Sequence, residues 1–389
     1  MKKSLLPLAL GGLGIGFTEF VMMGLLPDIA SDLHISIPKA GHLISLYALG
    51  VVVGAPVLVT IANNYPPKKI LMWLMGVFAI FNILSAFAPN YNLLSVARLL
   101  SGLPHGAFFG VGAVVASRLA DKGKEARAIS MMFAGLTFAN LVAVPLGTYV
   151  GHEFSWRITF GLIGLIGMVT MICINWLLPA LPNTKTENNQ RSEFAFFKSP
   201  EAWLIILLTT IGTGGLFAWI SYIAPMMTEV AHFSPGSVPY IMMLAGFGMV
   251  VGNFLGGKIG DMLSPAKACG MILVGIALCL LTVRLVAGNQ VLALIMTFIT
   301  GAVTFSLSTP IQLLMIRSAK GAEMLAASVT HAAFNIGNAL GAYFGGLVIA
   351  AGFGYAAPQL VGVIMALSGV VVVMFLLRKQ NSVITSGSL

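Results

Sequence analysis

Charge is what this sequence lacks most. Only 8% of its 389 residues are Asp, Glu, Lys or Arg, whereas 58% are hydrophobic. A soluble domain carries about 25% charged residues, so the composition excludes an ordinary soluble protein and indicates an integral membrane protein. At about 20 residues per crossing, the length accommodates about twelve spans with short connections.

Cysteine and reactive motifs are also scarce. The three cysteines, Cys173, Cys269 and Cys279, lie in apolar runs without a pairing pattern, which favours buried thiols over disulfides. The sequence shows no metal-ligand spacing and no nucleophile motif, and its acids are too scattered for a membrane enzyme. GGLGIG at residues 11–16 imitates a phosphate-binding loop but lies inside a span with no strand before it. We therefore expect no metal, no cofactor and no enzymatic activity.

Twelve apolar segments predict membrane-spanning helices. They cover residues 5–26, 40–62, 70–88, 93–119, 128–150, 156–178, 202–227, 238–260, 266–286, 291–316, 324–350 and 356–377. The apolar run at the start lacks a convincing cleavage site, which favours a retained first span over a signal peptide. A polar segment at 181–200 separates the two sets of six, so we expect bundles at 1–180 and 201–389 joined by a cytoplasmic linker.

The two halves of the chain contain similar segments at corresponding positions. GLLPDIA near the end of the first span matches YIAPMMT near the end of the seventh, with Pro27 opposite Pro225. Many secondary transporters consist of such repeats, with the binding site between them. We therefore expect an all-α membrane protein made of two pseudo-symmetric six-helix bundles.

The positive charges predict the topology. Seventeen of the 21 Lys and Arg residues fall on the side of both termini, and only Lys39, Arg157 and Arg284 fall on the opposite side. Because Lys and Arg collect on the cytoplasmic side, we expect both termini in the cytoplasm and the chain in a bacterial inner membrane. The net charge of +9 then reflects topology and lipid contact, not nucleic-acid binding. Nothing marks an oligomer face, so we expect a monomer.

Glu19 is the one acidic residue that lies well inside a predicted span. A carboxylate facing hydrocarbon costs several kcal/mol, about 2.5–3.5 on insertion scales, so a lone buried one indicates a functional site. Arg98 is the only Lys or Arg well inside a span. At a rise of about 1.5 Å per residue, both lie about 10 Å from the outer ends of their helices. We therefore expect Glu19 and Arg98 to pair.

This pair has two interpretations. Pairing offsets part of the desolvation cost of both charges and makes the proton affinity of Glu19 depend on the nearness of Arg98. A transporter can use that dependence, because protonation of Glu19 would release Arg98 and permit a conformational change. Alternatively, the pair is static and only fixes helix packing.

Other polar residues within spans are candidates to line a substrate cavity. His105, near mid-membrane, either contacts substrate or relays protons, or is a hydrogen-bonded packing residue. His331, Asn335 and Asn338 share one helix face. The candidate substrate-binding residues are Tyr47, His105, Asn140, Trp219, Tyr222, His331 and Asn335.

Four stretches then resemble a known family: TEFVMMGLLPDIASDL, RLLSGLPHGAFFGVG, ANLVAVPLG and the Trp156-Arg157 pair. Over essentially its whole length, the chain resembles major facilitator superfamily transporters of the twelve-helix drug:proton antiporter branch, and the arabinose/sugar-efflux-like members most of all. The resemblance implies a rocker-switch fold with spans 1, 4, 7 and 10 around the cavity. It also implies proton coupling by Arg98.

The resemblance further implies gating residues. Pro145 and Gly147 match the antiport motif, and Lys68, Lys69 and Asp261 match two cytosolic loop motifs. Asp261 would either cap a helix of the other half, where the dipole favours an anion, or be a solvated loop charge. Two positions depart from the family pattern: Asn64-Tyr65 replace the usual Asp and Arg, and Ala143-Val144 precede Pro145 where a glycine is usual.

These observations favour a proton-driven exporter of small organic molecules, either drugs or sugar-like compounds, that works by alternating access. Its partners would be a small-molecule substrate, protons and membrane lipid. The alternative within the same class is a facilitator or symporter in which Glu19 and Arg98 are structural. A channel would need a pore-forming oligomer with a filter segment, and a receptor would need an extramembrane signalling domain; the sequence shows neither.

Overall fold

Helices make up all the regular structure in the part of the chain that the computed structural model describes, namely residues 3–62, 65–121, 125–182, 197–319 and 323–386. The first half comprises η1 (Lys3–Leu5), α1 (Leu6–Asp32), α2 (Ile37–Ala62), α3 (Pro67–Ala86), α4 (Tyr91–Leu119), α5 (Glu125–Phe138), η2 (Ala139–Ala143), α6 (Val144–Val150), η3 (Gly151–Ser155) and α7 (Trp156–Leu177). The second half comprises α9 (Pro200–Ile220), α10 (Ile223–Pro225), η4 (Met226–Val230), η5 (Pro235–Ser237), α11 (Val238–Met262), α12 (Pro265–Val286), α13 (Gln290–Phe305), α14 (Ser308–Ser318), α15 (Glu323–Val348), η6 (Ile349–Phe353) and α16 (Pro358–Ser386).

These helices confirm the prediction of twelve membrane crossings. Eleven segments of the described chain are long and apolar enough to span a membrane, and one of them, Ala128–Leu177, has 50 residues. This segment changes direction at Ser155, whose backbone is extended and whose side chain accepts a hydrogen bond from the Arg157 N–H at the start of α7. It therefore crosses twice, which gives twelve crossings.

Three of the predicted spans differ in detail. The first continues through Pro27 to Asp32 as one helix, α1, although the sequence suggested an end near Leu26. The seventh breaks after α9 at Ser221–Tyr222, and the tenth breaks between α13 and α14 at Ser306–Leu307. The second and third differences share one feature: Pro225 and Pro310, which lack a backbone donor, follow each break closely.

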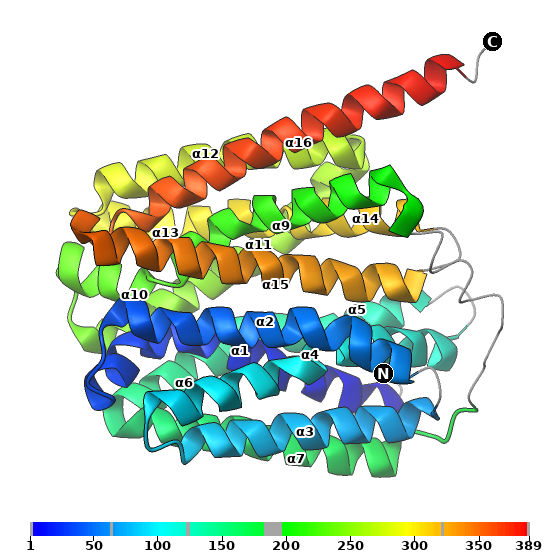
Figure 1. Ribbon diagram of the computed structural model, residues 1–389, viewed down its shortest axis with the longest axis horizontal. Helices are drawn as coiled ribbons and strands as arrows, with labels where there is room; N and C mark the ends of the chain where they lie inside the picture. Colours follow the sequence, from blue (N-terminus) through cyan, green and yellow to red (C-terminus); the bar gives the residue numbers. More distant parts are fainter. Residues whose placement is uncertain (1–2, 63–64, 122–124, 183–196, 320–322, 387–389) are drawn as a thin grey trace.

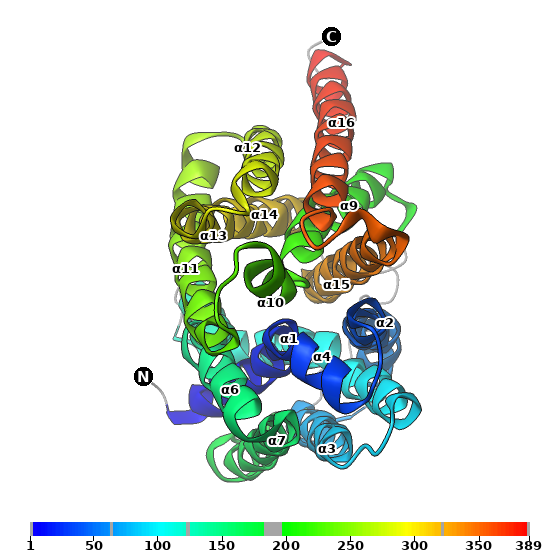
Figure 2. The same ribbon diagram turned by 90° about the vertical axis from the view of Figure 1, so that its left-hand side faces the viewer.

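The two halves lie side by side. We call the interface between them the seam. In Figure 1 helices α1–α7 of the first half lie below helices α9–α16 of the second half. The end-on view in Figure 2 shows α2 next to α15 on one side of the seam and α6 next to α11 on the other. The predicted linker at 181–200 falls largely on residues 183–196, outside the described residues.

The seam is tightly closed at the end of the bundle away from the two chain termini. Ser45 of α2 donates a hydrogen bond to the Ala339 carbonyl of α15 (3.0 Å). Within the second half, Tyr222 donates to the Ala342 carbonyl of α15 (2.7 Å), which places its hydroxyl at this end of the seam. A Cβ at Gly41 of α2 would lie only 2.3 Å from the Tyr222 hydroxyl oxygen, so this part of α2 is in direct contact with the Tyr222 side chain of the other half.

Helices α2 and α4 pack with their backbones in direct contact. A Cβ at Gly50 would lie 2.0 Å from the Leu99 carbonyl oxygen, and one at Gly102 would lie 2.2 Å from the Tyr47 carbonyl oxygen. Small residues permit this close approach between membrane helices. The contact fixes Tyr47 on α2 and Arg98 on α4 next to each other, which positions the site.

Candidate functional site

Glu19 lies at the seam. Its side chain is 6% exposed, and its carboxylate accepts a long hydrogen bond from the amide nitrogen of Asn338 in α15, at 3.5 Å. The acid of the first half therefore contacts the second half. The other amide atom of Asn338, Oδ1, has no hydrogen-bond partner among the described residues.

Arg98 lies on α4 and is fully buried. Its guanidinium forms hydrogen bonds with Thr18 of α1 and not with Glu19. It donates to the Thr18 hydroxyl (2.9 Å) and to the Thr18 carbonyl (3.2 Å). No direct ion pair joins Arg98 to Glu19 in the described structure, although the two charges interact electrostatically. Successive residues of a helix point about 100° apart, so Thr18 faces α4 while Glu19 faces α15.

The N-terminal half holds Arg98 through several other contacts. The Thr18 hydroxyl donates to Asn82 of α3 (2.7 Å), and the Asn82 amide donates to the Phe78 carbonyl (2.8 Å). The guanidinium carbon lies 4.4 Å from the centre of the Tyr47 ring and 5.5 Å from that of Phe160. Such cation–π contacts stabilise a buried arginine. Sequence reasoning missed Thr18 and Asn82, because their roles depend on helix pairing.

A line of aromatic side chains leads from Arg98 across the seam. The Tyr47 hydroxyl and His105 Nδ1 are hydrogen-bonded at 3.1 Å. The His105 ring lies 5.8 Å from the ring of His331 on α15. The structure therefore brings together three of the predicted substrate-binding residues, Tyr47, His105 and His331, two from one half and one from the other.

Three parallel rings continue this line towards the end of the bundle at which the termini lie. Phe109 of α4 stacks on His331 of α15, with ring centres 4.7 Å apart and an interplanar angle of 5°. Phe133 of α5 is parallel to both, at 5.2 Å from Phe109 and 5.7 Å from His331. Phe109 and Phe133 were missed, although Phe109 stands one helical turn after His105.

A cavity of about 360 Å³ adjoins these rings between the two halves. We call it the seam cavity. It is lined by residues of α4 and α5 from the first half and of α14 and α15 from the second. Its α4 and α15 residues lie near the end of α4 and the start of α15, so the cavity is on the side of the termini. The molecule thus combines a closed seam at one end with a cavity at the other.

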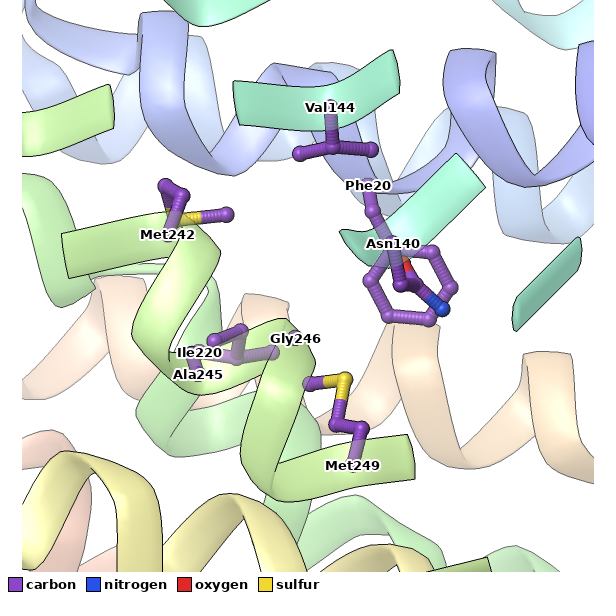
Figure 3. Close-up of a pocket in the computed structure, with 8 residues that line it drawn as sticks. All are labelled: Phe20, Asn140, Val144, Ile220, Met242, Ala245, Gly246 and Met249. Carbon is purple, nitrogen blue, oxygen red and sulfur yellow. The ribbon is translucent and has the colours of Figure 1, made fainter. Parts of the chain in front are cut away.

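A second, much smaller cavity lies along the seam on the α6–α11 side (Figure 3). Its volume of about 10 Å³ is enough for roughly one water molecule. Asn140 and Phe20 line it, and the amide nitrogen of Asn140 has no partner among the described residues. Asn140 belongs to η2, a π-helical turn just before Pro145, and such turns occur often at functional sites.

Of the seven predicted substrate-binding residues, all of which the structure describes, only His331 lines the seam cavity. Trp219 is fully buried in α9, and Tyr222 lies at the closed end, where its hydroxyl bonds to Ala342. Asn335 is buried in α15, and its amide nitrogen donates to the His331 carbonyl (3.0 Å).

The predicted gating residues occupy several places. Lys68 donates to the Asn175 and Leu178 carbonyls at the end of α7, both at 2.7 Å, and so joins helices of one half. Lys69 is exposed, whereas Pro145 and Gly147 are buried in α6, where a Cβ at Gly147 would lie 2.2 Å from the Phe17 ring of α1. Asp261 belongs to α11, but its side chain is not described, and Asn64 lies outside the described residues.

A helical membrane protein with two stacked halves and polar groups at their seam has the architecture of a secondary transporter. The family model described as Major Facilitator Superfamily matches residues 8–328. The chain belongs to this family, and it is a transporter and not an enzyme.

Known proteins agree with this assignment. The chain is 44% identical over 355 residues to the "Putative transporter AraJ" of Escherichia coli (strain K12), covering 91% of this chain and 90% of that one. It is 30% identical over 348 residues to a "Chloramphenicol resistance protein" of Streptomyces lividans, covering 88% of each. Among solved structures, a D-xylose-proton symporter has the same fold, with a TM-score of 0.76, 16% identity and 96% of each chain covered. The bacterial relatives and the many spans support a multi-pass inner membrane protein.

Proposed function

We propose that this protein exports small organic molecules in exchange for protons, with Glu19 as the proton carrier. The observation that carries the proposal is the contact of a buried carboxylate with the opposite half of the transporter, through Asn338. A proton that binds at such a contact changes the interaction between the halves. Coupling of protonation to alternating access needs that property.

The hydrogen bonding between Asn338 and Glu19 depends on whether Glu19 is protonated. A carboxylate accepts one bond from the amide nitrogen, whereas a carboxylic acid also donates its O–H. The unpartnered Oδ1 of Asn338 provides an acceptor for that donor. Protonation of Glu19 would therefore strengthen the α1–α15 contact in the present conformation, and deprotonation would weaken it.

Arg98 belongs to the same half as Glu19 and interacts with it only through electrostatic attraction. Its hydrogen bonds to Thr18 keep its charge within the first half, so the electrostatic attraction is present but no bond must break when Glu19 takes up a proton. With both termini in the cytoplasm, as the lysine and arginine distribution indicates, the seam cavity would receive substrate from the cytoplasm. We further propose that the halves are the predicted units 1–180 and 201–389.

The test is the direction of gradient-driven transport. Purified protein in liposomes with an acidic interior is expected to accumulate radiolabelled substrate, because exchange lets protons leave as substrate enters. Chloramphenicol and D-xylose are suitable probes, one aromatic and one a sugar. Accumulation of either probe only when the exterior is acidic would indicate symport and contradict the proposal.

A facilitator is the second candidate function. The bonds that fix Arg98 to Thr18, and Thr18 to Asn82, favour a structural role for the arginine. In that case a pH gradient of either direction leaves the initial rate of probe entry unchanged in the same liposomes.

A further inference from the structure

The seam cavity has an uncharged lining. Among the described residues that line it, none is Asp, Glu, Lys or Arg. A charged ligand would lose its hydration there without gaining a partner of opposite charge, which is strongly unfavourable in a membrane interior. The lining therefore selects against ions, including organic cations and anions.

Hydrogen-bonding groups are also few in the seam cavity. The hydroxyl of Thr330 already donates to the Ala326 carbonyl (2.7 Å), which leaves mainly Ser117, Gln312 and the His331 ring. A sugar would enter with several hydroxyl groups that lose water, and each unmade hydrogen bond lowers affinity. The lining selects against sugars as well.

Aromatic surface is what the cavity does offer. Phe133, His331 and Phe334 line it with partly exposed rings, and the buried Phe109 packs parallel to Phe133 and His331 within 5°. A flat ring that lies against this wall gains offset stacking in addition to its buried area. The volume of about 360 Å³ is within the usual range for sites that enclose drug-sized molecules.

We infer that the seam cavity binds an uncharged aromatic molecule by stacking it on rings supplied by both halves of the transporter. The inference rests on the proposed export function, for which it names the substrate class. Since Phe109 and Phe133 belong to one half and His331 to the other, the ligand would lie where the two halves separate. It would therefore respond directly to their relative motion.

Equilibrium binding to the full chain in nanodiscs tests this inference, with empty nanodiscs as the blank for partition into lipid. The probes are 2-naphthol and chloramphenicol, which are uncharged and aromatic, ethidium, which is aromatic and cationic, and D-xylose. We expect saturable binding of the two uncharged aromatics, at least about tenfold weaker binding of ethidium, and no binding of D-xylose. Tighter binding of ethidium or D-xylose, or no saturable binding of either uncharged aromatic, overturns the inference.

Two variants locate the binding at the seam cavity. Phe133→Ala removes one ring, and Ala113→Trp fills the space, so each is expected to weaken 2-naphthol binding about tenfold or more. The matched control is Phe138→Ala in the same helix, because Phe138 does not line the cavity and is 52% exposed. Unchanged affinity in both cavity variants, with the thermal unfolding midpoint retained, overturns the inference.

Because the binding assay uses no proton gradient, it distinguishes failure of the inferred substrate class from failure of the proposed export function. Normal aromatic binding without proton-driven exchange contradicts only the proposed function. Proton-driven exchange of D-xylose without aromatic binding contradicts only the substrate class.

Discussion

Glu19→Gln is expected to abolish proton-driven accumulation of substrate and to weaken substrate binding, while energy-independent exchange remains measurable. Glutamine keeps the shape and hydrogen-bonding capacity of a protonated glutamate but cannot release a proton. The variant would thus resemble a permanently protonated transporter. In liposomes with an acidic interior, accumulation of the probe should fall to the level of protein-free liposomes, whereas counterflow with unlabelled probe inside should persist.

Counterflow is the control that makes this result informative, because a misfolded variant loses both activities. A graded comparison comes from Asn338→Leu, which removes the amide but keeps the carboxyl group of Glu19. It should reduce proton-driven accumulation less than Glu19→Gln does and alter its dependence on pH. Gradient-driven accumulation of wild-type size in Glu19→Gln would remove the residue from the coupling mechanism.

Gly50→Ala is expected to destabilise the whole protein, even though it adds a single methyl group. The new Cβ would lie 2.0 Å from the Leu99 carbonyl oxygen, a backbone atom that cannot rotate away. Helices α2 and α4 would have to separate, at a cost of about 3 kcal/mol, the upper part of the usual range for overpacking. The thermal unfolding midpoint in detergent and the yield of monodisperse protein should both fall.

Gly161→Ala is the matched control for this substitution. Gly161 also lies within a membrane helix, α7, but a Cβ there would meet nothing within 4 Å. Alanine favours a helix over glycine by up to about 1 kcal/mol, so this variant should unfold at the wild-type temperature or slightly above it. Equal unfolding temperatures for Gly50→Ala and the wild type would show that the α2–α4 contact is looser than described.

The sequence predicted the fold well because the membrane imposes strong rules on it. Apolar runs of about 20 residues must be spans, and the twelve expected helices are present. The breaks in the seventh and tenth spans were harder to foresee. A proline within an apolar run can be absorbed in a long helix, as Pro27 is in α1, or can accompany a break, as Pro225 and Pro310 do. Only the packing against neighbouring helices decides between these outcomes.

The candidate site was predicted in part. Glu19 and Arg98 were found because buried charges are rare in spans, and their similar depth is consistent with the bonds between Arg98 and Thr18. Depth along a helix says nothing about rotation around it, which is why the expected direct pair is replaced by a bond to the preceding residue. The ring wall of Phe109 and Phe133 was not recognised, since an apolar ring in a membrane helix is equally compatible with lipid, with protein packing and with a cavity.

The central claim is that a proton on Glu19 and a bound substrate influence each other, and proton release on binding measures this directly. Purified protein in a weakly buffered detergent solution is mixed with 2-naphthol, and a pH-sensitive dye records the protons released across the neutral range. If a proton on Glu19 and a bound substrate disfavour each other, as exchange requires, linkage predicts release of up to about one proton per molecule bound by the wild type and none by Glu19→Gln. Equal release by the two proteins, at equal 2-naphthol binding, would contradict the account.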